Sequence, residues 1–248
     1  MKPKQVKREQ IGLVCSGVVT RSFAARMPRL LASIGPLKAT SYRVARRISN
    51  SLRAGRAVEN YSDLASCRAL WIVAADHMLD QIAADLPPGV PAVVCDTFRD
   101  SSHLGPRPAA TLHVIPTDER VLVAEGDPAV LRYLRRVAAA DRRKLIEIRP
   151  ASKPFLLAGV SLATHIALPW IAAAVESLRA AGLSRAEATR IVEQLGERTL
   201  RSYAKAGAKA WTPSAETELR RALDLNLDPR LGEVYRTGIQ CALEFFEN

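Results

Sequence analysis

Short apolar runs alternate with segments of helical periodicity over the first 150 residues of the chain. The apolar runs predict buried strands at residues 11–15, 37–41, 57–59, 69–74, 92–95, 110–113, 121–125 and 144–148. Helical patterns lie between them, the first after Thr20 and later ones at residues 44–53 and 78–86 and from Asp127-Pro128 onward. Asp76 is a predicted N-cap of the helix over 78–86, and Asp127 of the later one. Strands that alternate with helices predict an α/β domain with a doubly wound parallel sheet.

From Ser152 onward the pattern is helical only. Residues 153–181 are apolar almost all round, which predicts a helix buried on several sides and kinked at Pro169. Ser184 and Glu187 form a capping-box pattern before a helix that reaches about residue 203. Further helices are predicted at 214–225 and 229–246. The sequence therefore predicts two domains, an α/β one at residues 1–150 and an all-helical one at 151–248.

The composition is that of a soluble globular protein, with 48% hydrophobic and 25% charged residues among 248. We expect no membrane span, because no apolar run reaches ~18 residues, and we expect no signal peptide. The four cysteines have no metal-binding spacing. Buried free thiols in a reducing cytoplasm are the expectation, with no metal site.

The net charge of +11 is concentrated at one end of the chain. Residues 1–60 contain 13 Lys/Arg and only two acidic residues, whereas the other 188 contain 23 of each sign. A localised positive field favours a polyanionic partner, such as a phosphorylated cofactor. Nucleic acid is not the expected partner, because the aromatic platforms or recognition helix that it requires are missing.

The first strand and the turn after it contain an incomplete dinucleotide-binding fingerprint. Where G-x-G-x-x-G is expected, the chain reads Cys15-Ser16-Gly17-Val18-Val19-Thr20, so only the middle glycine remains. Gly17 keeps the position at which a phosphate approaches the backbone, and the N–H groups of this turn are predicted to bind a pyrophosphate. The alternative is an ordinary strand–helix turn.

Other predicted cofactor contacts follow the first strands. Arg21 opposes the helix macrodipole, and a bound pyrophosphate would remove that conflict. Ser41 and Arg43 stand where an NAD enzyme would have an acidic residue, and arginine there favours NADP, through its 2′-phosphate. The strand end Ala74-Ala75-Asp76 completes the predicted cofactor site.

The order of these features resembles a known superfamily. Residues 11–24, 73–79, 153–165 and 216–223, the last leading into 233–236, are together similar to the 6-phosphogluconate-dehydrogenase-like superfamily, near pyrroline-5-carboxylate reductase. Within it, the chain resembles a subgroup that joins a Rossmann-like domain to a helical C-terminal domain of unknown function. The resemblance implies an N-terminal NAD(P) site, a homodimer formed through the C-terminal helices, and a small-molecule substrate in the cleft between the domains.

The chain departs from that subgroup at the substrate positions. Lys153 is kept, but Leu156-Leu157 replace an aromatic-His pair and Thr164-His165 replace Ser-Asn. Lys153 and His165 are the candidate catalytic residues, because reduction needs one group that supplies a proton while the cofactor carries the hydride chemistry. His165 is expected to share a helix face with Ser161. The alternatives are an exposed first-turn lysine and a core histidine.

Two functions of different kinds follow. The first is an NADP-dependent oxidoreductase that reduces a small imine or carbonyl substrate with NADPH. The alternative is a degenerate Rossmann-like scaffold that binds a nucleotide or a protein partner without turnover; the missing glycines and Leu156-Leu157 favour it.

Overall fold

The computed structural model describes residues 10–16, 27–115, 120–221 and 227–246. Tertiary contacts divide the chain into two compact units, Met1–Ala158 and Gly159–Asn248.

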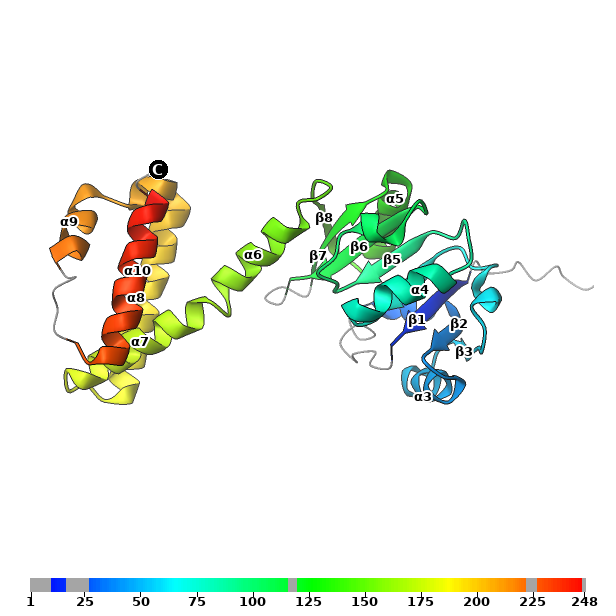
Figure 1. Ribbon diagram of the computed structural model, residues 1–248, viewed down its shortest axis with the longest axis horizontal. Coiled ribbons are helices and arrows are strands. Elements are labelled where there is room, and N and C mark those ends of the chain that lie inside the picture. The colour runs from blue at the N-terminus through cyan, green and yellow to red at the C-terminus, as the bar shows by residue number, and fades with distance from the viewer. Residues whose placement is uncertain (1–9, 17–26, 116–119, 222–226, 247–248) are drawn as a thin grey trace, which may run out of the picture. The chain divides into compact units, whose positions relative to one another are not determined.

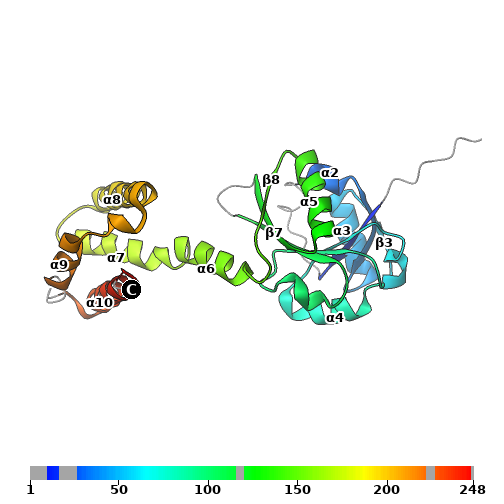
Figure 2. The same cartoon turned by 90° about the horizontal axis from the view of Figure 1, so that it is seen from above.

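The first unit is an α/β sandwich (Figures 1 and 2). Among the described residues, its strands are β1 (Ile11–Cys15), β2 (Ile34–Ala39), β3 (Arg56–Ala57), β4 (Leu70–Val73), β5 (Ala92–Cys95), β6 (Ala109–Val114), β7 (Val121–Gly126) and β8 (Lys144–Glu147). The helices are α2 (Pro28–Leu31), α3 (Tyr42–Leu52), α4 (Leu79–Asp85), α5 (Pro128–Ala140) and the start of α6 (Lys153–Ala163), with 3₁₀ turns η1 (Tyr61–Leu64), η2 (Asp76–Met78) and η3 (Ser101–Leu104).

The strands form one sheet in the order β3-β2-β1-β4-β5-β6-β7-β8. The first six positions have the order 3-2-1-4-5-6 that characterises dinucleotide-binding folds, in which the strand order reverses between β1 and its parallel neighbour β4. This confirms the predicted Rossmann-like sheet. Strand β7 is the exception, because it pairs antiparallel to β6. Only residues 115–120 connect these two strands, which is too short for the crossover that parallel pairing requires.

Alternation along the strands gives the sheet two apolar faces. Leu13, Trp71 and Leu112 contribute to the face that α2, α3 and α5 cover, while Val14 and Ile72 contribute to the face that α4 covers. Figure 2 shows α4 on the side of the sheet opposite α3 and α5. The two-residue period of an extended chain accounts for this division, and it keeps the turns at both strand ends at the rim of the core.

The second unit consists of helices only in its described part. They are the rest of α6, α7 (Ala167–Ala180), α8 (Arg185–Ala206), α9 (Pro213–Arg221) and α10 (Pro229–Phe246), with a 3₁₀ turn, η4 (Gly207–Ala210). The predicted capping box is confirmed, because Ser184 and Glu187 form it at the start of α8. At the start of α10, Asp228 accepts hydrogen bonds from the Arg230 and Leu231 amides.

The apolar segment 153–181 differs from its prediction in two ways. It is interrupted between α6 and α7 at residues 164–166 rather than kinked at Pro169, which lies in the first turn of α7. A proline there has no N–H to donate to the carbonyl of His165, so the first helix stops and a new one begins. The segment is also exposed instead of buried: Phe155 is 80% accessible and Leu168 is 59%.

Lys153–Ala180 is long and apolar enough to cross a membrane by length and composition, and within the chain none of the window that meets this test is buried. The expectation that no run reaches that length is therefore wrong for the helices as they stand.

Candidate functional site

The carboxyl ends of β1 and β4 lie next to each other at the point where the strand order reverses. Ser16 follows β1, and its hydroxyl accepts a hydrogen bond of 3.1 Å from the Ala75 amide, which follows β4. Ser16 also donates its own amide to the Val73 carbonyl, at 3.2 Å. In open α/β sheets this crevice is where ligands bind, so two predicted cofactor-binding segments meet at the expected place.

Several predicted contacts of the pyrophosphate lie outside the described residues: Gly17, Val18, Val19 and Arg21. Cys15 is described, and it is the buried last residue of β1. Burial raises the pKa of its thiol to about 12, so Cys15 is a neutral packing residue there. Ala74 packs against the apolar face that α4 covers.

The end of β2 has a positive helix start. The hydroxyl of Ser41 accepts a hydrogen bond from the Val44 amide at 3.2 Å and so caps α3. Arg43 is exposed in the first turn of α3, which has no acidic residue. A cation in that turn adds to the positive end of the helix dipole, and an anion beside it would stabilise both.

Asp76 has a different role from the one its position predicts. It is the first residue of η2, whose N-cap is Ala75, so the predicted capping role is wrong. Its carboxylate instead accepts a hydrogen bond of 2.9 Å from the Phe98 amide. Asp76 therefore joins the turn after β4 to the turn after β5, a longer-range interaction that local pattern could not reveal.

Lys153 is buried at the start of α6, with 1% of its surface accessible. Its ammonium group donates a hydrogen bond to the Arg99 carbonyl at 3.0 Å. Both the exposed first-turn interpretation and the ordinary rule that lysine stays in water are thus wrong for this residue. Burial lowers the pKa of Lys153, and the charges of Glu125 and Asp76 partly oppose that shift.

Glu125 provides the negative charge in this buried region, with 1% of its surface accessible. Its carboxylate accepts hydrogen bonds from the Ser101 amide at 2.8 Å, the Ser101 hydroxyl at 2.9 Å and the Thr111 hydroxyl at 2.7 Å. Three donors and a nearby ammonium compensate the cost of burying an ionised carboxylate. Glu125 also fixes the loop after β5 to strands β6 and β7.

His113, Asp96 and Cys95 complete this group of polar side chains. The Nδ1 atom of His113 lies 3.6 Å from Asp96 Oδ1 and is buried without a hydrogen-bond partner among the described residues. Burial lowers the pKa of His113, which Asp96 opposes and Lys153 reinforces. Burial also raises the pKa of the Cys95 thiol, so no thiolate nucleophile is present here.

His165 is not part of this group. It is exposed in the turn after α6, where its Nδ1 lies 3.2 Å from the Thr164 hydroxyl. The core-histidine interpretation is therefore wrong, and so is the expected shared helix face with Ser161, because the helix ends at Ala163. Lys153 begins that helix within the first unit, whereas His165 belongs to the second unit.

Sequence reasoning missed Glu125, Thr111 and Ser101. Glu125 is an acidic residue inside the apolar run of β7, and Thr111 is a hydroxyl residue inside the apolar run of β6. A polar residue within a buried strand needs a partner, and this signal could have found the pair. Among the described residues, no group of His, Cys, Asp or Glu is arranged to hold a metal ion.

The fold of the chain is similar to that of several solved structures. No family model matches the chain, and no curated protein matches it in sequence. The chain is similar to a structure of a Thermotoga maritima protein, with 16% identity, a TM-score of 0.65, and 96% of this chain and 98% of that one covered. An imine reductase from Myxococcus stipitatus in complex with NADP+ has 10% identity and a TM-score of 0.65, covering 96% and 92%. A pyrroline carboxylate reductase from Plasmodium falciparum with NADP bound has 11% identity and a TM-score of 0.55, covering 95% and 89%. The expected resemblance is confirmed in fold: a Rossmann-like domain followed by a helical domain, as in pyrroline-5-carboxylate and imine reductases.

Proposed function

We propose that this chain is an NADP-dependent oxidoreductase that reduces a small imine or carbonyl compound as a homodimer. The observation that carries the proposal is the junction at the strand-order reversal, where Ser16 bonds to Ala75 beside the positive start of α3. This is the crevice in which Rossmann-type folds hold a dinucleotide. The proposal stands on that geometry together with a fold shared with reductases that were solved with NADP.

The residues at the end of β2 fit NADP better than NAD. An acidic residue there would bond to the ribose hydroxyls of NAD and repel a 2′-phosphate. Here the first turn of α3 has no acid, and Arg43 is exposed within it. A guanidinium group can bond to phosphate oxygens in pairs, so Arg43 would hold the 2′-phosphate.

When bound, NADPH would supply a hydride to the carbon of a C=N or C=O group. The chain must then provide a proton for the nitrogen or oxygen. We propose that Lys153 holds this proton at Nζ, since its lowered pKa brings the ammonium nearer to donating at neutral pH. The Arg99 carbonyl orients that ammonium group. His165 is exposed, and we propose that it contacts the substrate in the dimer.

The homodimer proposal rests on the small core of the helical unit. Among its described residues, only Ala188 and Ile239 are buried apolar side chains. Meanwhile Leu168, Leu195 and Leu200 are each more than half exposed. A bundle that leaves this much apolar surface in water is unfavourable, and a second copy offers a matching apolar face. The three buried free thiols Cys15, Cys67 and Cys95 support a cytoplasmic location.

Separate titrations with NADPH and NADH, followed by ligand fluorescence and thermal shift, test the proposed function. We expect tight NADPH binding, weaker NADH binding, and a loss of NADPH affinity of about tenfold in Arg43→Gln. Arg53→Gln is the matched control, because Arg53 is exposed after the other end of the same helix. NADPH binding without turnover on any imine or carbonyl would favour the non-catalytic scaffold, and silence with both nucleotides would reject the cofactor site.

A further inference from the structure

A cavity lies at the amino ends of β1 and β4, opposite the carboxyl ends that form the proposed cofactor site. Its volume is about 260 Å³, and Ile11 at the start of β1 and Arg68 just before β4 both line it. The cofactor site follows the other ends of these same strands. A strand of five residues extends about 16 Å, so the two places are separate.

Positive charge dominates the lining of this cavity. Three arginines, Arg29, Arg68 and Arg136, face a single acidic residue, Asp141. Asp141 already has a structural task, because its Oδ1 accepts the Arg29 amide at 3.0 Å and joins α2 to the end of α5. Within the described part of the chain, no carboxylate forms an ion pair with the side chain of Arg29 or Arg136.

Tyr133 adds a directed hydroxyl to this positive lining. Its oxygen accepts a hydrogen bond of 3.2 Å from the indole N–H of Trp71, which is fully buried. A phenol that accepts from an indole still has its own proton to donate. The guanidinium carbon of Arg68 lies 5.4 Å from the centre of the Tyr133 ring, which holds the two groups together as a pair.

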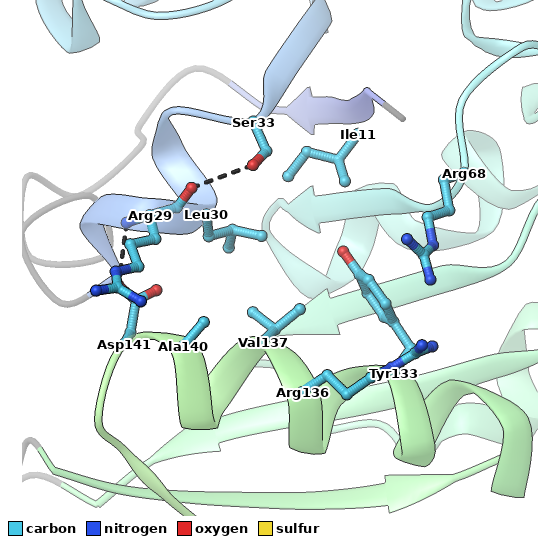
Figure 3. A pocket seen from close by; sticks show the side chains of 10 residues that line it. All are labelled: Ile11, Arg29, Leu30, Ser33, Arg68, Tyr133, Arg136, Val137, Ala140 and Asp141. Atoms are coloured by element: carbon cyan, nitrogen blue, oxygen red, sulfur yellow. Dashed lines mark hydrogen bonds between the residues drawn. The ribbon is translucent and has the colours of Figure 1, made fainter. Parts of the chain in front are cut away.

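The remaining walls are apolar. Figure 3 shows Leu30 from α2 and Val137 from α5 between the polar groups, with Arg68 and Tyr133 directed toward each other beside them. The cavity thus combines several groups that can donate hydrogen bonds to an oxyanion with a hydrophobic surface, a combination typical of sites for small organic anions. Arginines that form only a solvated basic surface would need no apolar side chains between them.

We propose that this cavity binds a small organic anion whose carboxylate or phosphate group is held by Arg68, Arg136 and the Tyr133 hydroxyl. The compact apolar body of the ligand packs against Leu30 and Val137. Arginine suits this task because its planar fork matches both oxyanions. The site is distinct from the cofactor site, so the full chain binds both ligands at once.

Calorimetric titration of the full chain with phenyl phosphate and with benzoate, in low salt, tests this proposal. We expect at least one probe to bind, and the tighter one identifies the head group as phosphate or carboxylate. Arg136→Gln should weaken binding about tenfold, whereas Arg132→Gln should leave it within twofold. Arg132 is the matched control because it is exposed one turn earlier on α5 and does not line the cavity.

Tyr133→Phe provides a second variant, expected to weaken binding about fivefold by removing one donor. Binding of neither probe, or equal binding by wild type and Arg136→Gln, would overturn the proposal. Inorganic phosphate that binds as tightly as phenyl phosphate would overturn the role of the apolar wall.

Saturation with NADPH should leave the affinity for the probe unchanged, and competition between them would contradict a separate site. Because Arg136 and Arg43 lie on different helices, α5 and α3, and serve different proposed sites, failure here leaves the NADPH titration of Arg43→Gln to be judged on its own result.

Discussion

The buried charges of Glu125 and Lys153 allow a quantitative test of how the buried polar group around them is stabilised. Glu125→Gln keeps the shape of the side chain and one carbonyl oxygen, so the bonds from the Ser101 amide and Thr111 can persist, now to a neutral acceptor. A bond to a charged group contributes roughly 1 kcal/mol more than one between neutral groups. The carboxylate accepts three such bonds, so we expect a loss of about 3 kcal/mol in local stability.

The second half of the test removes the cation. Lys153→Met alone leaves the Arg99 carbonyl without its donor and the carboxylate without its nearby positive charge, so we expect a loss of about 1–3 kcal/mol. The double variant Glu125→Gln/Lys153→Met removes both charges. It should therefore lose less than the sum of the single losses, by about 2 kcal/mol.

Hydrogen exchange measured by mass spectrometry suits this test, because it reports opening free energies for peptides of β6 and β7 separately from the helical unit. Glu147→Gln is the control: Glu147 is an exposed residue that pairs with Arg135, and its loss should cost about 0.5 kcal/mol or less. Additive losses in the double variant would refute the reasoning, since they would mean that the two buried charges do not interact.

Three further predictions concern other parts of the molecule. Because burial holds the pKa of Lys153 below its ordinary 10.5, the unfolded chain keeps this proton to higher pH. The stability of wild type relative to Lys153→Met should thus rise with pH between the lowered pKa and 10.5 and stay level below that window, as checked by denaturation at several pH values. Ser16→Ala removes the bond to the Ala75 amide and should weaken NADPH binding about fivefold in a fluorescence titration while the melting temperature of the free protein changes by no more than a few degrees. Leu200→Glu should convert the proposed dimer to a monomer in analytical ultracentrifugation, whereas Gln194→Glu, at an exposed polar position on a different face of the same helix, should leave it intact.

Local patterns were sufficient to predict most of the elements. The run of residues 92–95 is a strand with the predicted ends, and Asp127 caps α5 as its sequence indicates, by accepting hydrogen bonds from the Ala129 and Val130 amides. These outcomes follow because caps and buried strands depend on neighbouring residues. The reversed direction of β7 depends instead on the short 115–120 connection, and that length could have been counted.

Long-range partners could not be predicted in the same way. Asp76 is a residue type that commonly caps helices, yet its carboxylate accepts a hydrogen bond from the Phe98 amide, 22 residues away. Lys153 is buried only because β5, β7 and the loop after β5 converge on it. The exposed face of α6 and α7 was predicted as buried since the sequence records the hydrophobicity of a surface and not which molecule covers it.

The hydrogen bond from Trp71 to Tyr133 gives the protein an internal optical probe. An indole with none of its surface in water emits at shorter wavelength than the partly exposed Trp170, which is 37% accessible, so its signal can be resolved. Any molecule that draws the phenol proton toward itself will change the electronic environment of that indole. Emission at the blue edge of the spectrum can therefore follow occupancy of the arginine-lined cavity without a label.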